Sequence, residues 1–307
     1  MDHSHFIGQM RAGVLMTCVI LSGGAPVPVS VDGNAHLPCT DLQTPTRIQP
    51  PVPIASPDMD TLAKKMAQEI SKKKIGILVV VGGGGPENKV TDLGAKLRDA
   101  FNDSLARQSQ KTQVLEGKAV RDMLRKNRIS EGMLYTDVIG PWIVRHAPAD
   151  AYVILRLFAL TGAHASVVAE LFTRNKWGFE SIHREAGILA LADQQLASAE
   201  VDFQPEMNNP GALPVSTYTR SLKCLVCPNP SYSEEGRRLK ISGTVVLSLV
   251  VRPDGATDDV MVVHPLGHGL DANAIDSVLE WKFQAGKDLQ GQTAAMQVQV
   301  EVSFTLR

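Results

Sequence analysis

Apolar positions recur along the chain with different periods, and each period predicts one kind of element. Leu62, Met66 and Ile70 recur every four residues with lysines on the opposite face, which predicts an amphipathic helix. Residues 75–81 (IGILVVV) are a continuous apolar run, typical of a strand that is buried on both faces. Residues 296–306 alternate strictly, which predicts a strand with one buried face.

The stretch between residues 58 and 202 mixes these patterns in an order that predicts an α/β domain. Its further predicted elements are a helix at 90–105, a short strand at 112–117, a short helix at 120–124, two strands at 151–160 and 165–172, and a closing helix at 184–198. Thr161, Gly162 and Ala163 between the two strands predict a hairpin.

The last 80 or so residues give the order helix, strand, strand, helix, strand. A turn at Asp254 and Gly255 joins the first two strands, and the second helix covers residues 270–283. In the final strand we expect five side chains to face the core: Val298, Val300, Val302, Phe304 and Leu306. The side chains expected to face outward are Gln297, Gln299, Glu301, Ser303 and Thr305. Three antiparallel strands cannot close on themselves, so at least one long edge is expected to be available. The fold class is therefore α+β.

Composition excludes some classes of partner. The 307 residues are 44% hydrophobic and carry a net charge of −1, which gives no basic field for nucleic acid. Aromatic residues make up 5%, too few for a platform on which bases stack.

The amino terminus indicates export. Arg11 precedes 14 uncharged residues that end in small side chains, as in a secretory signal, and this stretch is short for a membrane span. Residues 1–25 are thus expected to be a signal peptide or an inner-membrane anchor, and Pro26 disturbs a helix at their end. Cys18 could suggest lipid attachment, although Thr17 is a poor residue before such a cysteine.

The domain boundaries follow from proline and periodicity. Residues 26–57 hold 8 of the 18 prolines and are expected to be a tether. An α/β domain at 58–202 precedes a linker at 203–229, and 230–307 form the last domain.

The glycines at 82–85 follow a buried strand, so a phosphate-binding loop must be considered. No Lys-Ser or Lys-Thr pair follows a glycine there, as a nucleoside triphosphate loop requires. Glu87 stands where a dinucleotide fingerprint has its third glycine and would repel pyrophosphate. A flexible crossover from a strand to a helix is the expected role, and no cofactor is predicted.

The region 60–200 resembles the envelope α/β domains of the TolB amino-terminal and curli-assembly lipoprotein type. The matching residues are Leu93, Gly94, Leu97, Phe101 and Leu105, and the strand 149–154. This resemblance implies a non-enzymatic role in assembly or interaction.

The region 224–307 resembles the TonB carboxy-terminal domain family more closely. The motifs that carry the resemblance are Pro230-Ser231-Tyr232, Gly243-Thr244-Val245, Asp254-Gly255, Leu270-Asp271, Ala274-Ile275, Val278 and Trp281-Lys282-Phe283. The resemblance implies a periplasmic module that adds a peptide segment of an outer-membrane transporter, or another envelope protein, as an extra strand. The partner-binding residues would then be the outward side chains Gln297, Gln299, Glu301, Ser303 and Thr305, with Pro230 and Tyr232 near them by family analogy. Coupling to an inner-membrane motor complex is a further implication.

Cysteines and histidines suggest structure and no catalysis. Cys224 and Cys227 could form a redox pair, half a zinc site or a local disulfide, and export favours the disulfide. His264 and His268 bracket a turn and are expected to be surface residues. We therefore expect no catalytic residues, no metal and no enzyme. The alternative to peptide recognition is a periplasmic scaffold whose last domain makes a homo-oligomer.

Overall fold

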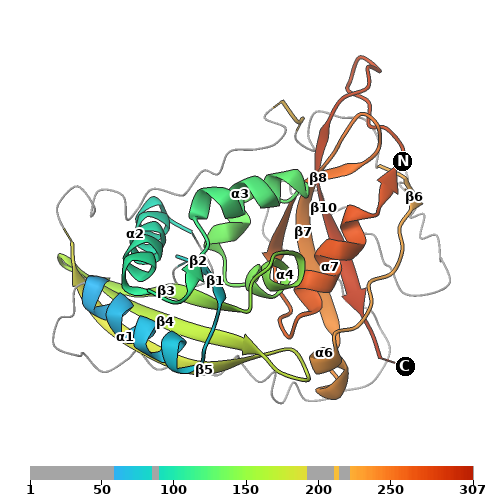
Figure 1. Cartoon of the computed structure of the whole chain (residues 1–307). Helices are drawn as coiled ribbons and strands as arrows, with labels where there is room; N and C mark the ends of the chain where they lie inside the picture. Colours follow the sequence, from blue (N-terminus) through green and yellow to red (C-terminus); the bar gives the residue numbers. More distant parts are fainter. Residues whose placement is uncertain (1–58, 85–89, 192–210, 214–221, 307) are drawn as a thin grey trace, which may run out of the picture.

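The structure is a computed structural model that describes residues 59–84, 90–191, 211–213 and 222–306 (Figure 1). Its helices are α1 (Met59–Lys72), α2 (Asp92–Gln108), α3 (Gly117–Lys126), the 3-10 helix η2 (Glu131–Tyr135), α4 (Gly140–His146), α6 (Glu234–Arg238) and α7 (Leu270–Leu279). Its strands are β1 (Ile77–Gly82), β2 (Gln113–Val114), β3 (Ala151–Thr161), β4 (His164–Arg174), β5 (Phe179–Ala190), β6 (Cys224–Val226), β7 (Gly243–Val251), β8 (Thr257–His264), β9 (Lys282–Phe283) and β10 (Met296–Phe304). We call residues 59–191 the N-terminal region and residues 222–306 the C-terminal region.

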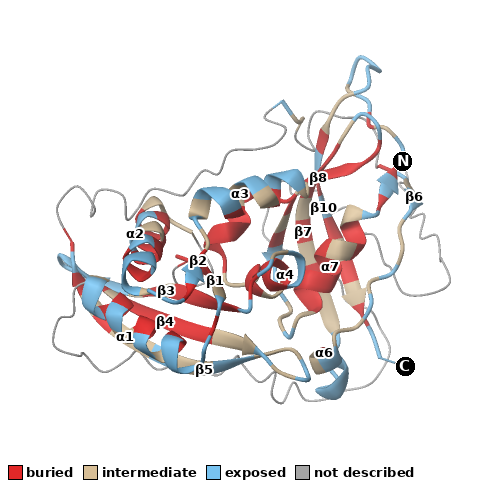
Figure 2. Ribbon diagram, viewed as in Figure 1, coloured by how far each residue is buried: buried red, intermediate tan, exposed pale blue. Residues whose placement is uncertain are grey.

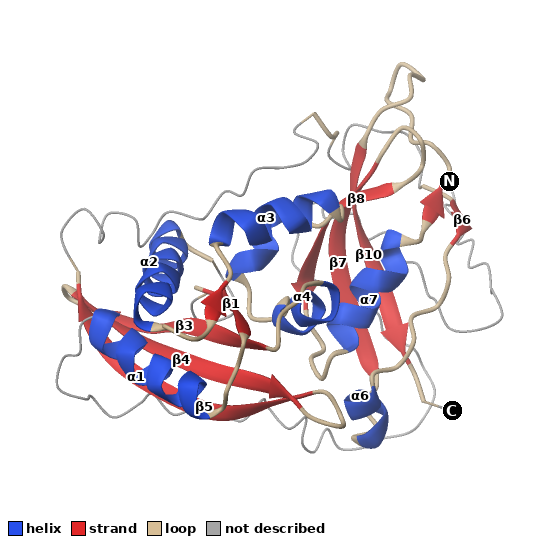
Figure 3. Cartoon of the chain, viewed as in Figure 1, coloured by secondary structure: helices blue, strands red, loops and turns tan. Residues whose placement is uncertain are grey.

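The N-terminal region is a five-stranded mixed sheet between two layers of helices (Figure 3). The strand order is β2-β1-β3-β4-β5, with β1 parallel to both of its neighbours and β3, β4 and β5 antiparallel. Leu78 and Val80 pack with α1 and α2, whereas Val79 and Val81 pack with α3 and α4 on the opposite face. The predicted burial of β1 on both faces is confirmed.

The third antiparallel strand corrects the sequence prediction. Residues 184–190 were expected in a helix, yet they belong to β5, which pairs with β4 along its whole length. Alanine, leucine and glutamate favour helices, but strand pairing and the packing of Leu189 in the core outweigh such local preference. The rest of the expected helix, 192–198, lies outside the described residues.

The glycine run packs a helix tightly against a strand. Gly83 has φ +112° and donates its N–H to the carbonyl of Leu155 at 2.7 Å, so this group extends the sheet. A Cβ on Gly83 would come within 2.6 Å of the carbonyl oxygen of Gly94 in α2. The chain therefore runs from a buried strand to a helix as predicted, and Gly83 and Gly94 allow the two elements to approach closely. The predicted flexibility stays a prediction, because residues 85–89 lie outside the described residues.

The C-terminal region has the expected three-stranded antiparallel sheet, with strand order β10-β7-β8. Helix α7 covers one face, and α6 precedes β7, so the predicted α+β fold is confirmed. Figure 2 shows the buried residues gathered on α7 and on the strands that it covers. Val298, Val300, Val302 and Phe304 are buried as predicted. The prediction for Leu306 is wrong, because β10 ends at Phe304 and Leu306 is 39% exposed beyond it.

The two regions share one hydrophobic cluster. It joins residues of β1, α3, η2 and α4 to residues of β7, β8, α7 and β10. Arg128 donates to the carbonyls of Thr257 at 3.1 Å and Leu279 at 2.6 Å, and Trp142 Nε1 donates to Asp276 at 2.8 Å. These contacts fix the position of the C-terminal sheet on the N-terminal region. Among the described helices, none combines the length and the apolar character that a membrane span requires.

Candidate strand-binding edge

The candidate site is the outer edge of β10, the last strand of the C-terminal sheet. All nine residues of β10 pair with β7 on its inner side. In an antiparallel pair, the N–H and C=O groups of alternate residues point away from the partner strand. The outward direction of the Gln297 N–H is recorded, so the backbone groups of Gln299, Glu301 and Ser303 point outward by the same alternation.

The chain itself places an extended residue on this edge. Leu213 forms a parallel bridge with Met296 at the amino-terminal end of β10. Its N–H donates to the carbonyl of Ala295 at 2.8 Å, and its carbonyl accepts from Gln297 N–H at 2.9 Å. At this end of β10, one residue of the linker therefore pairs with the edge in the parallel direction.

The predicted partner-binding side chains lie together on one surface. Gln297 and Gln299 are exposed, Glu301 and Ser303 are half-buried, and Thr305 is exposed after the strand ends. Ser303 Oγ contacts Thr244 Oγ1 of β7 at 3.3 Å, so part of this surface is an internal polar contact.

Tyr232 supports the strand rather than pointing to its edge. Its hydroxyl donates to the carbonyl of Ile241 at 3.0 Å, and its ring meets Phe304 edge-on at 5.4 Å between centroids. This packing fixes the carboxyl end of β10. Pro230 is half-buried in the segment before Tyr232.

The opposite edge of the sheet is occupied within the molecule. Ile129 bridges Val260 of β8 in parallel, the Ser130 N–H donates to Val260 O at 3.0 Å, and the Val260 N–H donates to Arg128 O at 3.1 Å. The N-terminal region thus adds its own segment to β8. Within the described residues, the β8 edge is thus occupied at Val260, so β10 is the edge that we consider for a foreign strand.

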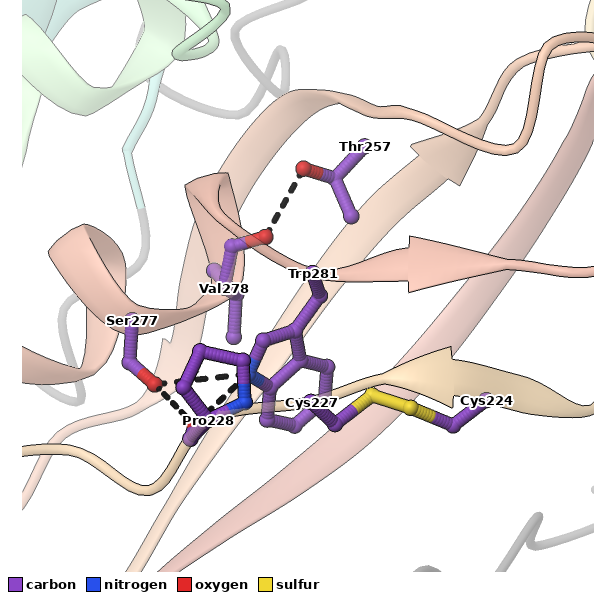
Figure 4. The surroundings of a disulfide bond; sticks show 7 residues. All are labelled: Cys224, Cys227, Pro228, Thr257, Ser277, Val278 and Trp281. Carbon is purple, nitrogen blue, oxygen red and sulfur yellow. Dashed lines mark hydrogen bonds between the residues drawn. A yellow bond between two sulfur atoms is a disulfide. The ribbon is translucent and has the colours of Figure 1, made fainter.

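A disulfide between Cys224 and Cys227 fastens the exit of the linker, with the two Cα atoms 6.2 Å apart. The next residue, Pro228, accepts hydrogen bonds from Trp281 Nε1 at 3.0 Å and Ser277 Oγ at 2.7 Å. Figure 4 shows these bonds and the disulfide at the same corner of the sheet. The linker therefore enters the C-terminal region at a fixed point.

Two carboxylates accept hydrogen bonds within turns next to the sheet. Asp254 accepts from the Arg252 guanidinium and the Ala256 N–H, and this lowers the pKa of Asp254 to about 2. Asp271 accepts from the N–H groups of Leu266 and Gly267, and its burial raises the pKa of this carboxyl despite those bonds. His268, beside them, is exposed, and no cluster able to hold a metal ion occurs among the described residues.

Sequence reasoning did not find the described residues that pair with the two edges of the sheet. Arg128, Ile129 and Leu213 carry no motif, and their role depends on which strand they meet in space. The alternation of β10 correctly gave the side chains from Val298 to Phe304 that face the core. That the outward side chains bind a partner stays a prediction.

Comparison with known protein families identifies one match, in the C-terminal region. Residues 228–306 match the family described as Gram-negative bacterial TonB protein C-terminal, so the C-terminal region is similar to that domain. This match points to no enzyme family. No curated protein matches the chain.

Several solved structures are similar to parts of the chain. The LpoB C-terminal domain from Escherichia coli is 14% identical, covering 44% of this chain and 99% of its own, with a TM-score of 0.33. The corresponding Salmonella enterica domain is 16% identical, covering 43% and 96%, with a TM-score of 0.34. The Pseudomonas aeruginosa TonB C-terminal domain is 20% identical, covering 31% and 94%, with a TM-score of 0.26. The resemblance of residues 60–200 to TolB amino-terminal and curli-assembly domains stays a prediction.

Proposed function

We propose that this protein binds an extended segment of an envelope protein by adding it as a strand to the outer edge of β10. The observation that carries the proposal is the parallel bridge between Leu213 and Met296. An edge that accepts one extended residue through two main-chain hydrogen bonds has the geometry for a longer segment. The TonB-like character of residues 228–306 supports a segment of an outer-membrane transporter as the partner.

In strand addition, main-chain hydrogen bonds supply the affinity and side-chain contacts supply the selectivity. Each main-chain hydrogen bond contributes a net ~0.5–1.5 kcal/mol, so a few such bonds suffice for a transient complex. The side chains of Gln297, Gln299, Glu301 and Ser303 flank the edge and would contact the side chains of the partner. The bound segment would compete with Leu213 or continue beyond it.

The wider biological setting is part of the same proposal. The protein is exported to the periplasm, where a TonB-like module meets its partners, and residues 1–25 are a signal peptide or an inner-membrane anchor. Residues 26–57 are the tether, 58–202 the α/β domain, 203–229 the linker and 230–307 the binding domain. Residues 1–58 lie outside the described residues. Coupling to an inner-membrane motor complex belongs to this proposal as well.

A scaffold role is the second candidate, and one observation favours it. The N-terminal region occupies the edge of β8 and shares a hydrophobic cluster with the C-terminal sheet. Two regions joined in this way form a fixed spacer, as a scaffold requires. In that case the β10 edge would pair with a second copy of the chain.

Two variants at one position test the proposal. Gln299→Pro removes an N–H that points outward, and proline is tolerated on a strand edge when its missing N–H faces away from the sheet. Gln299→Ala removes the side chain and keeps the N–H, so it is the matched control. Full-length protein is titrated with a synthetic peptide from the periplasmic amino terminus of an outer-membrane transporter, by fluorescence anisotropy.

We expect Gln299→Pro to weaken peptide binding by roughly tenfold, which corresponds to the loss of about 1.4 kcal/mol, with Gln299→Ala near wild type. Equal binding by both variants would contradict main-chain recognition. Absence of peptide binding together with a dimer in light scattering would favour the scaffold.

A further inference from the structure

A second candidate site lies between the two regions, away from the β10 edge. A cleft of about 690 Å³ opens between the turn 175–178, which joins β4 to β5, and the amino-terminal ends of α6 and α7. Figure 1 shows this end of the β4–β5 hairpin next to α6. The volume falls within the range of ligand sites in proteins, roughly 300–1,000 Å³.

Contacts between the regions hold the walls of the cleft in place. The Arg238 guanidinium of α6 lies 5.7 Å from the ring centroid of Trp177 in the hairpin turn. On the other side, Arg145 of α4 donates to Asn273 at 2.9 Å and Asp276 at 2.7 Å, both in α7. The cleft is thus preformed, which lowers the cost of ordering it around a ligand.

Aromatic rings form one surface of the cleft. Tyr152 and Phe172 stack with their centroids 4.9 Å apart, and Phe179 meets Tyr152 edge-on at 5.3 Å. Trp177, 40% exposed, stands at the rim. Such rings favour an apolar or aromatic side chain on the ligand.

Charged groups of both signs line the same space. Arg174 and Lys176 on the hairpin are exposed, and the described residues offer neither of them a carboxylate partner. Glu234 at the start of α6 likewise has no ion pair with a described residue. Asp137 also lines the cleft; its Oδ2 accepts from Arg156 Nε at 2.5 Å, and its buried Oδ1 has no hydrogen-bond partner among the described residues. A ligand complementary to this lining carries a carboxylate that faces Arg174 and Lys176. It also carries N–H donors that face the acidic side chains.

We propose that this cleft binds a short peptide in which a carboxylate stands next to an aromatic or aliphatic side chain. A peptide supplies all three features: N–H donors, an acidic group and an apolar side chain that packs on the rings. The carboxylate lies toward Arg174 and Lys176, and the apolar side chain lies against Phe172 and Phe179. This site is separate from the strand-binding edge, and its test does not depend on that edge.

The three tryptophans provide the readout. The full-length protein is labelled with ¹⁵N-tryptophan and titrated with the tripeptide Gly-Phe-Glu, and the indole N–H signals are followed by NMR. Trp177 lies at the rim, whereas the Trp281 indole is buried and bonded to Pro228 O, so Trp281 reports on the fold. The matched probe Gly-Phe-Gln with an amidated carboxyl end lacks both carboxylates.

We expect a saturable shift of the Trp177 signal with Gly-Phe-Glu, little shift of Trp281, and at least fivefold weaker binding of the amidated probe. The double variant R174Q/K176Q should bind Gly-Phe-Glu roughly fivefold more weakly, because it loses two exposed ion pairs of moderate strength. The control K73Q, at an exposed position just after α1, should bind as wild type.

Three results would overturn the proposal. They are no saturable shift of the Trp177 signal up to about 10 mM peptide, equal binding by R174Q/K176Q and wild type, and equal binding of the two probes. An unchanged Trp281 signal in the double variant ensures that lost binding does not reflect unfolding.

Discussion

Replacing Leu213 by proline should strengthen the binding of an added strand. The substitution deletes the N–H that donates to the carbonyl of Ala295 at 2.8 Å, and leaves the Leu213 carbonyl that accepts from Gln297. If the linker and a partner segment use the same acceptor on β10, weakening one favours the other. The variant Leu213→Ala keeps the N–H and loses only the side chain, which is half-buried against the shared cluster.

The size of the effect follows from one main-chain hydrogen bond. Its net contribution of ~0.5–1.5 kcal/mol corresponds to a factor of roughly 2 to 13 in the equilibrium that holds the linker on the edge. When the linker occupies the edge most of the time, the apparent affinity for a competing peptide rises by up to that factor.

Fluorescence anisotropy of a labelled transporter peptide measures the change in wild type, Leu213→Pro and Leu213→Ala. The difference between the two variants isolates the N–H from the side chain. A proline one residue earlier, Ala212→Pro, is the control, because no bond from the Ala212 N–H to β10 is recorded among the described residues. Affinity in Leu213→Pro that equals or falls below that of Leu213→Ala, in folded protein, would refute competition at this edge.

Three further predictions concern stability. Gly83→Ala should destabilise the protein by roughly 1–3 kcal/mol or more, because φ is +112° and the new Cβ would lie 2.6 Å from a backbone atom. Gly162→Ala, with φ +57° and open space around it, should lower the free energy of unfolding in urea by less. Reducing the disulfide between Cys224 and Cys227 should lower the free energy of unfolding by about 2 kcal/mol, since the loop is short. Calorimetry should show a fall in Tm of roughly 4–8 °C. An unchanged Tm would show that the bond does not constrain the unfolded chain. Arg128→Ala removes two hydrogen bonds between the N-terminal and C-terminal regions, so the two regions should unfold in two separate calorimetric transitions. A single transition at unchanged Tm would contradict coupling through this residue.

The C-terminal fold was predictable because its local patterns agree with its packing. The alternation in β10 assigns Val298, Val300 and Val302 to the core, and all three are buried. The turn at Asp254 and Gly255 joins β7 to β8 as its sequence indicates. Each of these signals is local, so no knowledge of distant residues was needed.

The N-terminal region was predictable only in part, because its last element depends on a neighbour. Residues 184–190 have helical preferences, and β4 beside them imposes a strand. In the C-terminal region, the pairing of β6 with β9 was missed as well, since it joins segments more than fifty residues apart.

The candidate site shows the same limit. The sequence predicts the strand and the face of its side chains, but an edge is defined by what else pairs with the sheet. Leu213 and Ile129 decide this, through contacts over about 80 and 130 residues of chain. The prediction for Leu306 failed for a different reason: the alternation continues past Phe304, where β10 ends.

Amide hydrogen exchange along β10 tests the central claim most directly. In full-length protein saturated with a transporter peptide, strand addition predicts slower exchange at Gln299 and Ser303, whose N–H groups point outward. Val298 and Val300, whose N–H groups point to β7, should change little. A bound peptide that leaves the exchange of Gln299 and Ser303 unchanged would contradict recognition at this edge.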